Sequence, residues 1–196
     1  MKVLVNLMEQ MQILKQSLSD APIIWKGEYP YFVHPITDGV PRLDPNVLQA
    51  IVDLVEPLVD WDNIDIILGI EAMGLPLTAP LAVRTGVPMV IARKRSYGLD
   101  GEVQIDQQTG YSKGSIYLND IKAGERIAII DDVLSTGGTM RSVIEGVKQT
   151  KASVENIVIV VEKGDGMQNL KQDYPSIKFD SLVKLHMDGE KIIVTD

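Results

Sequence analysis

Residues 127–140 have the sequence IAIIDDVLSTGGTM, and this stretch decides the fold. The four apolar residues 127–130 predict a buried strand of a parallel sheet. Asp131 and Asp132 follow at its carboxyl end, then a loop of small and hydroxyl residues, and a helix is expected to begin at Thr139. In an open parallel sheet, ligands bind beyond the carboxyl ends of the strands. The stretch therefore predicts a ligand site as well as a strand–loop–helix unit.

The residue types in this stretch indicate a sugar phosphate. Glycines allow backbone N–H groups to close around a phosphate, and a helix N-terminus adds a favourable dipole. Ionised Asp side chains instead accept hydrogen bonds from hydroxyl groups. A ligand with a diol at one end and a phosphate at the other is a ribose 5-phosphate. The alternative is a plain strand-to-helix turn, which does not need paired Asp, Ser-Thr and Gly-Gly together. The sequence has neither a Gly-Lys-Ser/Thr phosphate loop nor a G-x-G-x-x-G dinucleotide motif.

Apolar runs and helical periodicity alternate along the rest of the chain. Asp44 as N-cap and Pro45 at the first helical position predict a helix to about residue 60, which Pro57 would kink or shorten. Other helices are expected at 2–19, 75–85, 139–151 and 167–171. Strands are expected at 64–70, 87–92, 116–118, 127–130, 157–161, 179–185 and 192–194. This order predicts a single α/β domain over residues 1–196, with a parallel-sheet core flanked by helices.

Composition excludes several classes of protein. The chain has 196 residues, of which 45% are hydrophobic, and a net charge of −8. We expect no nucleic-acid partner, because such proteins carry a broad positive field. The chain has no Cys and only two His residues, so disulfides and a His-rich metal site are not expected. No signal peptide or membrane-spanning stretch is predicted, so a cytoplasmic protein without membrane contact is expected.

The 127–140 stretch resembles the phosphoribosyl-pyrophosphate signature of type I phosphoribosyltransferases. Residues 29–39 (YPYFVHPITDG) and 93–98 (RKRSYG) are most similar to the archaeal hypoxanthine/guanine phosphoribosyltransferase subfamily, which is related to the adenine and xanthine enzymes. The resemblance implies a type I phosphoribosyltransferase fold with an N-terminal helix and small hood in residues 1–45. It also implies a mobile active-site loop at 96–115. That segment is long and rich in Gly. The alternative is that it is a flexible surface loop without a role in catalysis.

The resemblance assigns roles to specific residues. Asp131 and Asp132 are the catalytic pair, which holds the ribose hydroxyls near the developing positive charge. The 5-phosphate is held by Ser135, Thr136, Gly137, Gly138 and Thr139. Pyrophosphate is contacted by the loop of Glu71, Ala72, Met73 and Gly74, and neutralised by Arg93 and Lys94. The adenine enzymes usually have Arg in place of Met73, so backbone contacts are expected there. The alternatives are a simple strand–helix turn at Glu71 and a solvated basic run at Arg93.

The purine base is assigned to Lys163 and Val133. Lys163 follows the strand 157–161, where its ammonium could donate a hydrogen bond to a 6-oxo group. The alternative is a surface lysine after a strand. The xanthine enzymes share the Glu-Lys pair at this strand end, whereas the adenine enzymes tend to lack the lysine.

Together these features predict an enzyme of purine salvage that uses two substrates, phosphoribosyl pyrophosphate and a free purine base. It converts hypoxanthine or guanine to IMP or GMP and releases pyrophosphate. Mg²⁺ is expected as the cofactor, held through substrate oxygens and water rather than by a protein cage. A homodimer is expected, because the N-terminal helix and aromatic hood offer apolar surface. The alternatives are an adenine or xanthine phosphoribosyltransferase, or a non-catalytic regulator of transcription that senses phosphoribosyl pyrophosphate.

Overall fold

A six-stranded sheet forms the centre of the computed structural model, which describes residues 2–109, 112–189 and 191–195. Five of its strands run parallel, and only the edge strand β10 is antiparallel to its neighbour β9. The strand order across the sheet is β10 (Lys191–Thr195), β9 (Lys178–Asp188), β8 (Ser153–Glu162), β7 (Arg126–Leu134), β3 (Ile66–Ile70) and β4 (Met89–Ala92). The predicted α/β architecture with a parallel core is confirmed.

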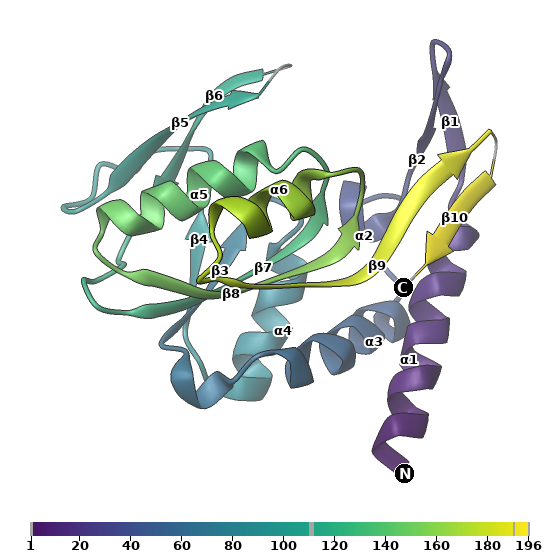
Figure 1. Ribbon diagram of the computed structural model, residues 1–196, viewed down its shortest axis with the longest axis horizontal. Coiled ribbons are helices and arrows are strands. Elements are labelled where there is room, and N and C mark those ends of the chain that lie inside the picture. Colours follow the sequence, from purple (N-terminus) through teal and green to yellow (C-terminus); the bar gives the residue numbers. More distant parts are fainter. Residues whose placement is uncertain (1, 110–111, 190, 196) are drawn as a thin grey trace.

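Helices cover both faces of this sheet (Figure 1). One face carries α3 (Pro45–Val55) and α4 (Leu75–Thr85), and the other carries α5 (Gly138–Gln149) and α6 (Gly166–Asp173). The side chains of β7 pack against the helices on both faces of the sheet, because successive residues of a strand point to opposite faces. Ala128 and Ile130 pack with the α3–α4 layer, whereas Ile127 and Ile129 pack with the α5–α6 layer. The chain thus forms two apolar clusters that share one sheet.

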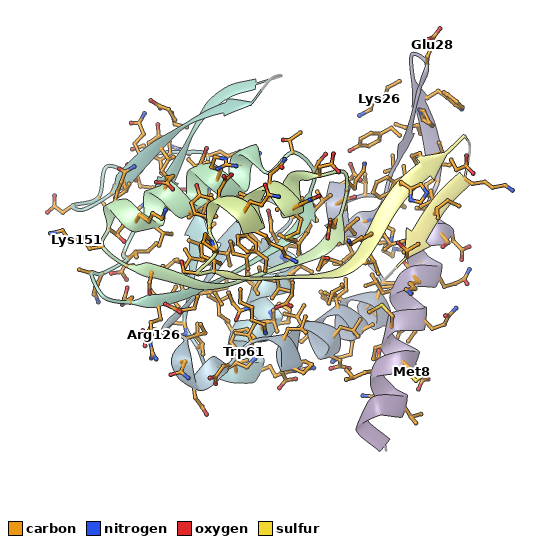
Figure 2. The ribbon with its side chains drawn as sticks, viewed as in Figure 1. Met8, Lys26, Glu28, Trp61, Arg126 and Lys151 are labelled. Atoms are coloured by element: carbon orange, nitrogen blue, oxygen red, sulfur yellow. The ribbon has the colours of Figure 1, made fainter. Side chains whose placement is uncertain are left out.

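The N-terminal segment builds the hood. Helix α1 (Lys2–Ser19) packs against α3 and β10, and it is followed by the antiparallel hairpin of β1 (Ile23–Lys26) and β2 (Tyr29–Phe32). The hairpin projects from the body of the molecule, with Lys26 and Glu28 near its tip (Figure 2). The short helix α2 (Pro35–Asp38) follows, and its N-cap is His34, whose ring Nδ1 accepts a hydrogen bond from Ile36 N at 3.1 Å. Among the described residues, no helix is long and apolar enough to span a membrane.

A second hairpin replaces most of the loop that the sequence predicts after residue 93. Its strands, β5 (Val103–Thr109) and β6 (Ser112–Leu118), are antiparallel, and residues 110–111 lie outside the described residues. Val103 and Ile105 alternate with polar residues and pair with Leu118 and Ile116, respectively. The side chain of Ile105 also packs on α5, where a Cβ added to Gly146 would lie 2.0 Å from it. The strand predicted at 116–118 is therefore confirmed as the end of β6, whereas β5 was missed, although the alternation at 103–106 was a signal for it.

Several element boundaries also differ from the prediction. The helix expected to reach residue 60 ends at Val55, and a 3₁₀ turn at Glu56–Leu58 follows, because Pro57 cannot donate a helical hydrogen bond. Strand β7 continues beyond residue 130 to Leu134, since Asp131 and Val133 pair with Ile159 and Val161 of β8. Asp131 and Asp132 therefore lie within the last part of the strand rather than after it.

The start of α6 touches the loop that follows β7. Gly166 N donates a hydrogen bond to Ser135 O at 3.0 Å, and a Cβ added to Gly166 would lie 2.1 Å from that oxygen. Only a residue without a side chain permits this approach of two backbones. Gly166 therefore allows α6 to pack directly against the loop after β7.

We predict that Gly166→Ala lowers the free energy of unfolding by about 1–3 kcal/mol, because the added methyl group meets backbone atoms that cannot rotate away. Chemical denaturation measures this change. Gly114→Ala is the matched control, since Gly114 is exposed and a Cβ there would meet nothing within 4 Å. Equal stability of the two variants would contradict the packing described here.

Candidate active site

A cavity of about 180 Å³ lies at the carboxyl end of β7. It brings together nearly all the residues predicted to hold the sugar phosphate, because the strand, the loop and the first turn of α5 are consecutive in the chain. Its lining residues are Asp131, Val133, Leu134, Ser135, Thr136, Gly137, Gly138, Thr139 and Met140. Asp132 is not among them, although its side chain interacts with that of Asp131.

The loop after β7 has the form of an anion site. Gly137 adopts the left-handed conformation with φ 81° and is the N-cap of α5. The first N–H groups of a helix have no carbonyl partners within that helix, and they carry the positive end of its dipole. Ser135 and Thr136 are exposed beside them. This arrangement suits a phosphate group at the mouth of the cavity.

The two carboxyl groups are buried next to each other, with Asp131 8% and Asp132 7% exposed. Burial raises the pKa of Asp131 well above its usual value, and the charge of Asp132 raises it further. Burial also raises the pKa of Asp132, to about 6. The charge of Lys94 acts in the opposite direction on the pKa of Asp131. Without a ligand, the fold therefore favours a pair of carboxyl groups that retains a proton.

The loop after β3 reaches the same place. Its Gly74 packs closely against β3 and β7, because a Cβ there would lie 2.7 Å from Ile70 N and 2.9 Å from Asp131 Oδ1. Glu71 Oε2 accepts a hydrogen bond from Lys94 N at 2.9 Å. Ala72 is exposed, and Met73 is half-buried. The structure thus places the loop of Glu71, Ala72, Met73 and Gly74 beside the buried carboxyl pair.

The basic run after β4 is tied to this loop. Arg93 Nε lies 3.2 Å from Glu71 Oε2, without the alignment of a hydrogen bond, and Arg93 Nη2 donates to Tyr97 Oη at 3.0 Å. Glu102 fixes the segment beyond: it accepts hydrogen bonds from Ser96 Oγ and Tyr97 N, which lower its pKa to about 2. Arg93 is therefore held by protein groups, whereas Lys94 is exposed near the carboxyl pair.

Lys163 lies where β8 ends, next to β7. Its backbone N donates to Leu134 O at 2.8 Å, and its half-buried side chain places Nζ 4.7 Å over the ring of Phe32. Burial lowers the pKa of Lys163, and the charge of Asp38 partly offsets this. Phe32 and Asp38 belong to the hood, and sequence reasoning gave neither of them a role of its own. Their only signal was the aromatic stretch at 29–39.

The chain matches the phosphoribosyl transferase domain over residues 43–187. The protein belongs to the phosphoribosyltransferase family. It is 45% identical to a hypoxanthine/guanine phosphoribosyltransferase of Aciduliprofundum boonei, over 95% of this chain and 100% of that protein. It is 47% identical to the protein of that name from Ferroglobus placidus, over 92% of this chain and 96% of the relative. These matches confirm the predicted family and the predicted transferase activity.

Solved structures of adenine phosphoribosyltransferases share the fold of this phosphoribosyltransferase. The enzyme of Thermoanaerobacter pseudethanolicus has a TM-score of 0.72 at 23% identity, covering 89% of this chain and 99% of that one. The Trypanosoma brucei enzyme, in complex with AMP, pyrophosphate and ribose-5-phosphate, has a TM-score of 0.69 at 22% identity, covering 89% and 79%. The predicted type I phosphoribosyltransferase fold is confirmed.

The carboxyl pair predicts how stability changes with pH in the ligand-free protein. A folded-state pKa raised above the unfolded value gives stability that is complete below the unfolded pKa and is lost as pH rises through the folded pKa. For Asp132 that loss develops as pH rises above the unfolded pKa of about 4 and is complete once pH has passed the folded pKa of about 6. We therefore expect Asp132→Asn to be more stable than wild type by about 1–3 kcal/mol at a pH of about 7.5, and the gain to vanish at a pH of about 4.

Urea denaturation at the two pH values measures this. Asp65→Asn is a control in which the free energy of unfolding should change in the opposite direction. Hydrogen bonds from Arg126 lower the pKa of Asp65 to about 2, so the charge of Asp65 is favourable in the fold. That variant should be less stable than wild type near neutral pH. A loss of stability for Asp132→Asn at the higher pH would show that the buried pair is not strained.

Proposed function

We propose that this protein transfers the phosphoribosyl group of phosphoribosyl pyrophosphate to hypoxanthine or guanine, giving IMP or GMP and pyrophosphate. The proposal rests on one observation: three groups lie together at the carboxyl edge of the sheet. They are the carboxyl pair of β7, the anion site before α5, and Lys163 at the end of β8. The names of the relatives that are 45–47% identical agree with this reaction.

The chain's own residues position the substrates and stabilise charge. The loop 135–139 holds the 5-phosphate, which places the ribose hydroxyls against Asp131 and Asp132. Each hydroxyl donates to a carboxylate oxygen, which favours the ionised pair. The bond from the anomeric carbon to pyrophosphate breaks, a bond to the base nitrogen forms, and the N–H proton of the base passes to the released pyrophosphate. Positive charge develops on the sugar beside these carboxylates as the first bond breaks. Preorganised charge of this kind is the largest contribution in many enzymes.

Mg²⁺ would be shared between the protein and the substrate. Among the described residues there is no group of three or more His, Cys, Asp or Glu side chains able to hold a metal ion. The residues that are present fit Mg²⁺ bound mainly by substrate oxygens and water, which is the arrangement that this ion prefers. Asp131 and Asp132 would hold its water shell or the sugar hydroxyls that it binds, and the ion would supply charge neutralisation of pyrophosphate.

The base assignment rests on Lys163 and on the half-buried Val133 at the cavity. An ammonium has donors only, so it matches the 6-oxo acceptor of hypoxanthine, guanine and xanthine and not the 6-amino group of adenine. The relatives' names favour hypoxanthine and guanine over xanthine. The alternative function is a non-catalytic regulator of transcription, and the names of the relatives, which are transferases, favour the enzyme instead.

The proposed assembly is a homodimer. Large apolar side chains are exposed on α1 and the hood, including Met8 at 74% and Trp25 at 53% (Figure 2 labels Met8). Large apolar side chains left in water favour association with a partner that covers them. Light scattering at micromolar concentration tests this, and a monomer would contradict it. Location in the cytoplasm stays a prediction.

We predict that Asp131→Asn and Asp132→Asn each lower kcat by about a hundredfold or more, because each removes a charge beside the cationic sugar while keeping the side-chain shape. Single-turnover kinetics with Mg²⁺ and phosphoribosyl pyrophosphate measure the loss. Asp173→Asn, on the exposed side of α6, is the control and should retain wild-type turnover. Near-wild-type turnover of both active-site variants would refute the sugar-site assignment.

A panel of free bases tests the substrate. We expect hypoxanthine and guanine to be converted well and adenine poorly, and Lys163→Ala to lose most of this preference while the KM for phosphoribosyl pyrophosphate stays within about twofold. A site built on one hydrogen bond can discriminate by as much as about ten-thousandfold, and a partly exposed lysine gives less. Fastest turnover with adenine, or full selectivity in the variant, would refute the assignment of the base.

A further inference from the structure

The hood supplies the surroundings of the Lys163 side chain. Phe32 lies on β2, far from β8 in the sequence, and its ring is only 3% exposed. The ammonium of Lys163 lies over that ring, with Nζ 4.7 Å from its centroid. An aromatic face attracts a cation, and the attraction is stronger where water is excluded. Phe32 therefore limits where the ammonium can lie.

Asp38 is a fixed anion on the same hood segment. Its Oδ1 accepts a hydrogen bond from Tyr31 Oη at 2.8 Å, and its Oδ2 accepts from His34 N at 3.0 Å and from Thr37 Oγ1 at 2.7 Å. Tyr31 in turn stacks on Phe32, with ring centroids 6.2 Å apart. Burial acts to raise the pKa of Asp38, but the hydrogen bonds outweigh burial and lower it. The carboxylate is thus charged and held in one orientation.

The chain after Asp38 anchors it to the active site. Gly39 adopts φ 72° and donates its N–H to Pro35 O at 3.1 Å, which ends α2. A Cβ on Gly39 would lie 3.2 Å from Met73 Sδ, so the hood packs on the loop that follows β3. Asp38 is therefore positioned from the hood on one side and from the predicted pyrophosphate loop on the other.

The charge of Asp38 acts on the groups at the base end of the site. It raises the pKa of Lys163 against the effect of burial, and it also raises the pKa of Asp132. Glu162, next to Lys163 in the chain, is occupied elsewhere, because it accepts a hydrogen bond from Ser181 Oγ at 2.7 Å and lies 3.7 Å from Lys184 Nζ. Asp38 is thus the carboxylate that favours the charged form of Lys163.

We propose that Phe32 and Asp38 form a seat for Lys163 and act as specificity-determining positioning residues, which hold its ammonium as the donor to the 6-oxo group of the base. The ring fixes the place of the ammonium, and the carboxylate, held on the same hood segment, favours its charged form. This inference rests on the proposed function. It assigns base selection to the hood, while the sugar and phosphate sites stay with β7 and α5.

Asp38→Asn tests the seat, because Asn keeps the shape and removes the charge. We expect the KM for hypoxanthine to rise about three- to tenfold and the preference over adenine to fall, while the KM for phosphoribosyl pyrophosphate stays within about twofold. The alkaline limb of the pH profile of kcat/KM for the base should move to lower pH. Phe32→Leu, which keeps apolar volume without a ring face, should change base selection in the same direction. Asp44→Asn is the matched control, because Asn caps α3 as well as Asp does.

A direct measurement separates the seat from the reaction. NMR titration of lysine labelled with carbon-13 gives the pKa of Lys163, whose resonance is assigned by its loss in Lys163→Gln. We expect this pKa to be lower in folded Asp38→Asn than in wild type, and unchanged in Asp44→Asn. An unchanged Lys163 titration in Asp38→Asn would overturn the seat, even if hypoxanthine proves to be the substrate. A wild-type enzyme that prefers adenine would overturn the proposed function, and with it the selecting role.

Discussion

The burial of two adjacent carboxyl groups at the end of β7 is the constraint on which the site depends. Asp131 and Asp132 are each less than 10% exposed, since their values are 8% and 7%. Charged carboxylates in such a place are unfavourable unless hydrogen-bond donors or cations compensate them. The fold favours a pair that retains a proton, and a ligand with vicinal hydroxyl groups would supply the missing donors. Burial of the carboxyl pair therefore lowers the stability of the ligand-free protein and favours the binding of a ligand that donates hydrogen bonds.

The backbone around this pair is packed closely enough to require glycine at particular positions. Gly74 allows the loop after β3 to lie against Asp131, and Gly166 allows α6 to touch the loop after β7. A side chain at position 74 would push the loop after β3 away from Asp131, and one at position 166 would push α6 away from the loop after β7. Three segments far apart in the sequence can therefore surround one sugar phosphate, because parallel strands bring their carboxyl ends to one edge of the sheet. The hood closes the same edge from the N-terminal side.

Sequence reasoning was most successful where one local pattern determines both structure and chemistry. Residues 127–140 predicted the strand, the loop and α5, and the structure places seven of the predicted sugar-phosphate and base residues of that stretch in one cavity: Asp131, Val133, Ser135, Thr136, Gly137, Gly138 and Thr139. The end of β7 was misjudged, because carboxylates were expected to end an apolar strand, whereas pairing with β8 carries the strand to Leu134. The alternation at 103–106 was missed within a segment rich in polar residues and Gly.

The roles of Asp38 and Gly166 could not be predicted from the sequence. Asp38 acts on the ammonium of Lys163, which is more than a hundred residues away in the sequence. Gly166 contacts the backbone of Ser135, from which α5 and β8 separate it in the sequence. An Asp at the end of a short helix and a Gly at the start of another have ordinary local explanations as turn and cap residues. Only the packing of the hood on the sheet, and of α6 on the loop, distinguishes them from such residues.

We expect the substrate sugar to bind to a carboxyl pair that retains a proton in the free protein. Titration calorimetry of phosphoribosyl pyrophosphate with Mg²⁺, in buffers of different ionisation enthalpy at a pH of about 6, counts the protons released on binding. Wild type should release more protons than the double variant Asp131→Asn/Asp132→Asn, because the bound hydroxyls lower the pKa values of the pair. Equal proton release by the two proteins, with binding retained, would contradict it.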